Sequence, residues 1–179
     1  MTELSSSRVW VMRATFLGLA LMIMFFHLLP LETIPRRWAP PDLLIAFTFA
    51  WVLQRPDYVP ALSIAAVMLV ADLMLQRPPG LLALLVVLGS EYLKNRNTSL
   101  GQASFAGEWL TVGLVIVAIT LINRMVLTLL VVDRAPLALS LIQMLLTIAA
   151  YPLVVLISRG LMGVRKPAPS DARGLGGGI

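Results

Sequence analysis

The 179-residue chain is strongly apolar, with 59% hydrophobic and only 13% charged residues. Soluble domains are on average about 45–50% apolar and about 25% charged, so this composition excludes an ordinary soluble domain. It predicts a single all-α polytopic membrane protein. The net charge of +5 is explained by basic residues in short loops, without a nucleic-acid partner. The absence of cysteine excludes disulfides and thiolate chemistry.

The first half of the chain begins with a polar segment, residues 1–13, which we expect to be a cytoplasmic N-terminus. The apolar segment 14–31 is about long enough to cross a bilayer and has no small-x-small cleavage site after it, so we expect an uncleaved span. Residues 32–41 form a proline-rich break. The next span is expected over 42–53, and it reaches a tolerable length only when 38–54 is counted.

Four more spans are expected in the remainder, each ended by a turn or a polar loop. Their ranges are about 58–75, 81–93, 105–132 and 137–161, with the longest polar loop over 94–104. The Gly- and Pro-rich residues 162–179 are expected to form a disordered cytoplasmic tail. The predicted organisation is therefore a six-helix transmembrane domain, residues 14–161, between two polar termini.

The distribution of basic residues favours an orientation with both termini in the cytoplasm. In a six-span topology nine Lys and Arg lie on the inner side and four on the outer side, as the positive-inside rule requires. The inner residues are Arg8, Arg13, Arg55, Lys94, Arg96, Arg159, Arg165, Lys166 and Arg173; the outer ones are Arg36, Arg37, Arg77 and Arg134.

Asp72 is an ionisable residue inside the third expected span, near its outer end. A charge at a helix centre in a bilayer costs roughly 2.5–3.5 kcal/mol, and the negative end of the helix dipole further disfavours a carboxylate. We therefore expect Asp72 to find a donor, and Arg124 of the fifth span is the first candidate. Asp42 is a rival partner for Arg124. In a third arrangement Asp72 reaches Arg77 or water, and Arg124 extends toward the membrane surface.

Two further polar features have local interpretations. His27, the only histidine, is expected at the interface, because a metal site normally needs three or four ligands. Glu91 and Lys94 are three residues apart at the inner end of the fourth span, which favours an ion pair on one helix face. No nucleophile elbow, zinc-protease motif or phosphate-binding loop is present. We expect no catalysis, no cofactor and no metal.

A series of short motifs between residues 40 and 96 carries a resemblance to a known family. They are Pro40-Pro41-Asp42-Leu43-Leu44, Gln54-Arg55-Pro56-Asp57-Tyr58, Ala71-Asp72-Leu73, Arg77-Pro78-Pro79-Gly80-Leu81 and Glu91-Tyr92-Leu93. In their order and spacing the chain resembles the rod shape-determining protein MreD family. Elsewhere only size and the pattern of spans agree. The commoner family pattern has glycines before the aspartate of the third span, where this chain has Ser63, Ala65, Ala66 and Ala71.

The resemblance implies a non-catalytic protein of the bacterial inner membrane. Such proteins accompany MreC and, through it, the MreB filament, RodA and a class B penicillin-binding protein in the elongation complex (the elongasome). There they help to organise lateral peptidoglycan synthesis and rod cell shape. The family is also similar in fold to the S-components of energy-coupling-factor vitamin transporters, which place six helices around an outward cavity.

Two functions remain open from the sequence. The first is a membrane scaffold that binds partner helices, which fits the small residues of the first and third spans and the scarcity of polar sites. The alternative is a small-solute-binding membrane subunit or carrier, which fits a polar cluster of His27, Asp42, Asp72 and Arg124 in the outer half. A cavity lined by these residues favours the alternative, and a closed bundle favours the scaffold. An intramembrane enzyme is the least favoured function.

Overall fold

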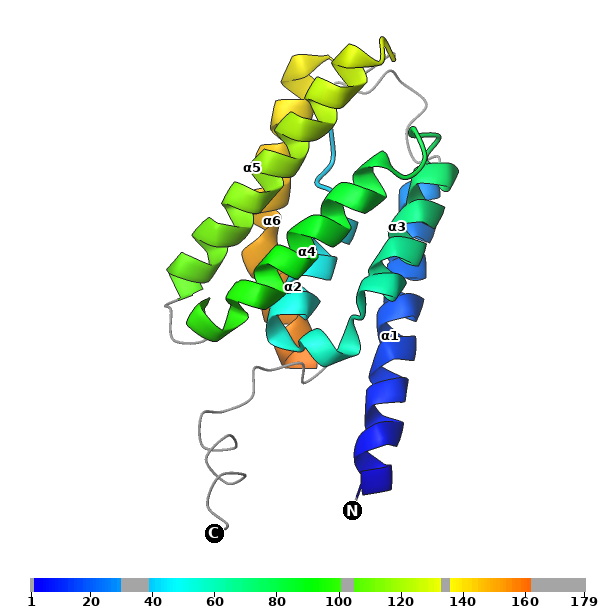
Figure 1. Cartoon of the computed structure of the whole chain (residues 1–179), viewed down its shortest axis with the longest axis vertical. Coiled ribbons are helices and arrows are strands. Elements are labelled where there is room, and N and C mark those ends of the chain that lie inside the picture. Colours follow the sequence, from blue (N-terminus) through cyan, green and yellow to red (C-terminus); the bar gives the residue numbers. More distant parts are fainter. Residues whose placement is uncertain (1, 30–38, 101–104, 133–135, 162–179) are drawn as a thin grey trace.

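The computed structural model of the chain is an up-and-down bundle of helices, and it describes residues 2–29, 39–100, 105–132 and 136–161 (Figure 1). The helices are α1 (Thr2–Leu28), α2 (Leu43–Gln54), α3 (Ala61–Met74), α4 (Leu81–Leu100), α5 (Phe105–Leu129) and α6 (Leu137–Leu161), with a 3-10 helix η1 (Pro56–Tyr58) before α3. We call the end where α1 begins and α6 ends the terminal end. The opposite end, with the α3–α4 turn, is the hairpin end.

The six helices of the described chain confirm the all-α, six-helix expectation. Within the described residues, three stretches are long and apolar enough to cross a membrane: Ser7–Leu28 of α1, Phe105–Leu129 of α5 and Leu137–Gly160 of α6. This agrees with a multi-pass membrane protein. The helices α2 and α3 are apolar but shorter.

Polar residues continue two of the helices beyond the expected spans. The helix α1 already begins at Thr2, ahead of the span expected from residue 14. Likewise α4 runs to Leu100, through most of the polar segment expected as a loop. Neither Gly nor Pro interrupts residues 94–100, and local side-chain pairs three and four residues apart support the helix there. The tail expected over 162–179 lies outside the described residues.

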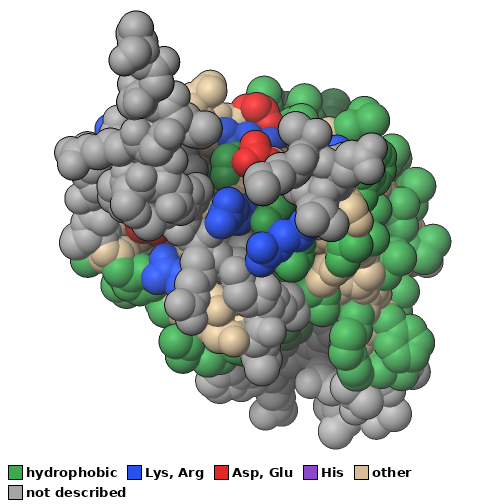
Figure 2. Space-filling model, turned by 90° about the horizontal axis from the view of Figure 1, so that it is seen from below, with side chains coloured by type: hydrophobic (Ala, Val, Ile, Leu, Met, Phe, Trp, Pro, Cys, Tyr) green, Lys and Arg blue, Asp and Glu red, His purple; other side chains and the backbone are tan. Residues whose placement is uncertain are grey.

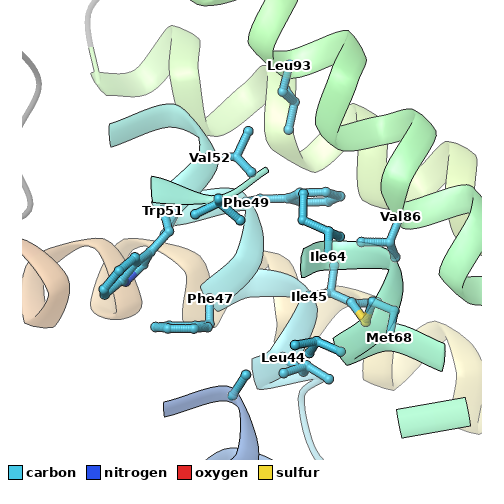
Figure 3. Close-up of a cluster of buried hydrophobic side chains, with 14 of the residues drawn as sticks. Leu44, Ile45, Phe47, Phe49, Trp51, Val52, Ile64, Met68, Val86 and Leu93 are labelled. Atoms are coloured by element: carbon cyan, nitrogen blue, oxygen red, sulfur yellow. The ribbon is translucent and has the colours of Figure 1, made fainter. Parts of the chain in front are cut away.

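The short helix α2 is the centre of the bundle. Every residue from Leu44 to Gln54 is buried, and the helix packs against α6, α4, α1 and η1. In Figure 3, Phe47 and Trp51 point to one side of α2, while Phe49 points to the other, toward Ile64 of α3. Twelve residues extend about 18 Å at about 1.5 Å each, less than the bilayer core of about 30 Å. Such a helix is stable in a membrane only where protein surrounds its ends.

The helix α1 is attached to this centre by one face. Over residues 7–28, the part of α1 whose burial is described, the buried residues are Phe16, Ala20 and Met24, spaced four residues apart. The ring of Phe16 lies 5.3 Å from that of Phe47 and 5.8 Å from that of Trp51, measured between ring centroids. Aromatic pairs of this kind add roughly 0.5–1.5 kcal/mol beyond area burial. The aromatic cluster therefore fixes the position of an otherwise exposed helix.

Gly89 is the point of closest approach between α4 and its neighbours. A Cβ placed on it would lie 3.0 Å from Val115 Cγ1 and 3.1 Å from Ile119 Cδ1 of α5, and 3.4 Å from Phe49 of α2. Three helices therefore meet at a position where a side chain has no room.

Enlarging Gly89 tests this packing. We predict that Gly89→Leu lowers the free energy of unfolding by about 1–3 kcal/mol, the usual cost of overpacking a filled core. The matched control is Gly18→Leu, because a Cβ on Gly18 would meet no atom within 4 Å. Reversible unfolding in detergent micelles measures both variants, and equal stabilities would contradict the close packing.

Candidate functional site

The polar residues of the hairpin end are organised by the turn between α3 and α4. The helix α3 ends in a Schellman motif, in which Gln76 has a φ of 53° and the Arg77 N–H bonds the Asp72 carbonyl at 2.9 Å. Gly80, with a φ of 90°, then turns the chain into α4. Only glycine adopts this φ without strain, so the tight return of the chain depends on it.

Asp72 caps the helix that follows it. Its side chain is 1% exposed, and its Oδ2 accepts hydrogen bonds from the Gly80 N–H at 3.1 Å and the Ala83 N–H at 3.3 Å. The first N–H groups of a helix have no partner within the helix, and the positive end of the dipole favours a carboxylate. The N-terminus of α4 thus satisfies the acid that we expected to need a cation. The proposed Asp72–Arg124 ion pair was therefore wrong.

Asp42 caps α2 in a similar way and connects three elements. Its Oδ1 accepts a hydrogen bond from the Ile45 N–H at 3.3 Å, and its Oδ2 lies 3.3 Å from Arg77 Nη1. Its own N–H donates to Thr147 Oγ1 of α6 at 2.8 Å. Asp42 was expected as the alternative to Asp72 in an ion pair with Arg124. In the structure Asp42 forms its ion pair with Arg77 of the α3–α4 turn.

Arg124 connects α5 to α6, because its guanidinium donates to Ser140 Oγ. Beside it lies a cavity of about 170 Å³. The polar residues that line this cavity come from α5, α6, the N-cap of α2 and the α3–α4 turn: Asp42, Arg77, Thr120, Asn123, Arg124, Ser140, Gln143 and Thr147. Ile45, Leu82, Ile116, Ile119, Leu127 and Met144 are among its apolar lining. We call it the hairpin-end cavity.

A second, water-sized cavity of about 10 Å³ lies nearby, lined in part by His27, Asp42, Asp72 and Arg77. The four residues of the predicted cluster are thus divided between two cavities. His27 and Asp72 line the small one, Arg124 lines the large one, and Asp42 lines both. The residues expected to form one polar cluster therefore do not line a single cavity.

Several lining residues were missed, although a pattern for them exists. Ser140, Gln143 and Thr147 recur at spacings of three and four along α6, and Thr120, Asn123 and Arg124 do so along α5. Such spacing places side chains on one face of a helix. Polar residues spaced three and four apart within an apolar helix are therefore the sequence signal that predicts the cavity-lining faces of α5 and α6.

The terminal end contains a buried carboxylic acid, Glu108, which was not among the predicted site residues. Glu108 of α5 is 2% exposed, and its Oε1 accepts a hydrogen bond from the Tyr151 hydroxyl at 2.9 Å. Arg159 Nη2 lies 4.0 Å from Glu108 Oε2, and Arg159 Nε donates to Gln54 Oε1 at 3.2 Å. These contacts join the end of α2 to α5 and α6.

The pair expected at Glu91 and Lys94 is local to α4. Lys94 Nζ lies 2.8 Å from Glu91 Oε1, and the contact involves no other helix. Across the described ranges, no group of three or more His, Asp or Glu could hold a metal ion.

Comparison with known proteins gives no relative: no family model, no curated protein and no solved structure matches the chain.

Two double-mutant cycles test the partners assigned to Asp72 and Asp42. We predict that Asp72→Ala destabilises the protein by about 1–3 kcal/mol, because the buried Ala83 N–H and the partly buried Gly80 N–H lose their acceptor. Its effect should add to that of Arg124→Ala within about 0.5 kcal/mol, as for residues that do not interact. Asp42→Ala and Arg77→Ala should instead couple by about 0.5–1 kcal/mol.

Both cycles are read from the free energy of unfolding in detergent micelles. A coupling between Asp72 and Arg124 equal to that between Asp42 and Arg77 would contradict the assignment.

Proposed function

We propose that this protein is a non-catalytic scaffold of the MreD type in the bacterial inner membrane. In this role it binds MreC and helps to organise lateral peptidoglycan synthesis in the elongation complex. The observation that carries the proposal is the role that the residues of the family-like motifs have in the fold. Asp42 and Asp72 cap helices, Gly80 turns the chain and Arg77 holds Asp42. Ionisable groups engaged in holding backbone support a structural function better than a chemical one.

The size of the hairpin-end cavity also supports a scaffold. Pockets that enclose small-molecule ligands usually measure about 300–1,000 Å³, whereas this cavity measures about 170 Å³. The cavity is therefore smaller than is usual for a vitamin-sized solute, which favours the scaffold over a carrier. The core around α2 is filled by side chains (Figure 3).

The flanks of the bundle suit partner helices in a membrane. Leu17, Leu21 and Phe25 lie on the exposed face of α1, the helix that touches the bundle along one side only. Large exposed apolar residues also occur along α5 and α6. These flanks can be covered by lipid or by the membrane helices of other subunits, and a scaffold needs such surfaces.

We propose an orientation with the terminal end in the cytoplasm. Figure 2 shows this end of the molecule, with charged side chains gathered on it and apolar side chains around them. Basic residues of α1, α4 and α6 at this end include Arg13, Lys94, Arg96 and Arg159. An excess of Lys and Arg marks the cytoplasmic side of membrane proteins. Both chain termini would then be cytoplasmic.

The alternative is a small-solute-binding subunit or carrier resembling the energy-coupling-factor S-components. One observation favours it: the hairpin-end cavity brings Asp42, Arg77 and Arg124 together in the half of the bundle expected to face outward. A scaffold and a carrier of this kind are expected to bind different partner proteins.

Purification of the tagged full-length chain from its native membrane in a gentle detergent separates the two functions. We predict that MreC is recovered in amounts comparable to the tagged protein, with RodA and a class B penicillin-binding protein at lower yield. An unrelated multi-pass protein with the same tag and abundance is the control. Recovery of ATPase subunits with a transmembrane coupling protein would overturn the scaffold in favour of transport.

A further inference from the structure

The hairpin-end cavity lies close to one end of the bundle. Arg124 is five residues before the end of α5 at Leu129, and Ser140 is three residues after the start of α6 at Leu137. At about 1.5 Å per residue these positions are roughly 8 Å and 5 Å from the helix ends. In a bilayer this depth corresponds to the boundary between the hydrocarbon core and the phospholipid head groups. Lipid phosphates are the anions present there.

The cavity lining favours an anion. Its described residues contribute two guanidinium groups, Arg77 and Arg124, and one carboxylate, Asp42. The two oxygens of Asp42 already accept hydrogen bonds, from Ile45 N–H and from Arg77. The carboxylate is thus directed toward protein partners, and the positive charge exceeds the negative charge by one among these residues.

Neutral donors complete the lining. The side-chain amides of Asn123 and Gln143 line the cavity, and neither forms a hydrogen bond with a described residue. Each amide offers two N–H donors. Guanidinium groups match the oxygens of a phosphate group in geometry and form strong charge-assisted bonds with it. The cavity volume of about 170 Å³ is well above the roughly 10–15 Å³ that one water molecule needs and below the roughly 300–1,000 Å³ of pockets for larger ligands, which suits a group the size of a phosphate.

We propose that the hairpin-end cavity binds a phosphate group, supplied by a membrane phospholipid whose acyl chains lie along α5 and α6. Arg77, Arg124, Asn123 and Gln143 donate to the phosphate oxygens. The bound lipid then joins the α3–α4 turn to α5 and α6. The inference does not depend on the scaffold function, because it rests on the lining of the cavity alone.

The test uses the full chain, stripped of lipid in a neutral detergent, and follows its thermal unfolding midpoint. Dioleoylphosphatidylglycerol is compared with dioleoylglycerol, which has the same acyl chains without the phosphate. Inorganic phosphate, matched with sodium chloride for ionic strength, is the third probe. We expect the phospholipid to raise the midpoint by about 5 °C or more at saturation, and dioleoylglycerol to leave it within about 1 °C.

Three variants locate the effect. Arg124→Gln and Gln143→Met should each weaken the binding of the phospholipid, the former by about tenfold. Gln143→Met removes donors without changing charge or length, so it remains informative if Arg124→Gln does not fold. The control is Arg96→Gln, which removes an exposed arginine of α4 near the terminal end.

The outcomes separate the sources of the phosphate. A shift with the phospholipid alone supports a lipid ligand, and an equal shift with inorganic phosphate supports the same site with a free anion. Equal shifts with the phospholipid and dioleoylglycerol would overturn the proposal. So would Arg124→Gln and Gln143→Met variants that both bind the phospholipid as Arg96→Gln does.

Discussion

The length of α2 is the constraint on which the rest of the structure depends. At 12 residues the helix is too short to cross a bilayer, so the peptide groups at both ends need partners from the protein. At the hairpin end Asp42 caps the helix and is held by Arg77 and Thr147. At the terminal end Gln54 is held by Arg159, which also approaches Glu108. Polar residues of the α3–α4 turn and of α6 therefore contact α2 where it begins and where it ends.

The same constraint explains the arrangement of the other helices. Because α2 is buried on all sides, α1, α4 and α6 must each cover part of it, and Gly89 lets α4 approach both Phe49 of α2 and the helix α5 closely. The α3–α4 hairpin adds rigidity through Asp72, which ties the end of one helix to the start of the next. A rigid bundle with apolar flanks is suited to holding partner helices in fixed positions. Its small polar cavity is suited to a lipid head group.

The helices were largely predictable from the sequence, because long apolar segments have few alternatives in a membrane. The expected span 137–161 matches α6, and the expected second span differs from α2 by one residue at each end. The helices differ from the expected spans where polar residues continue α1 and α4 as helix. The partner of Asp72 could not be predicted, because it is a backbone N–H group and not a side chain. The positive φ of Gly80 turns the chain so that its N–H reaches the Asp72 carboxylate. Glu108 was not predicted as a buried residue because it lies at the polar edge of an apolar segment. Its burial results from the packing of α5 against α6, which places it beside Tyr151.

Labelling from the lipid phase tests the central position of α2 most directly, and it requires no substitution. A photoreactive apolar carbene precursor dissolved in the bilayer modifies side chains that face lipid, and peptide mass spectrometry locates the label. The account predicts label at exposed positions of α5 such as Leu110, Leu114 and Leu121. It predicts none from Leu44 to Gln54, all of which are buried. Label within that segment at the level found in α5 would contradict a bundle built around a buried short helix.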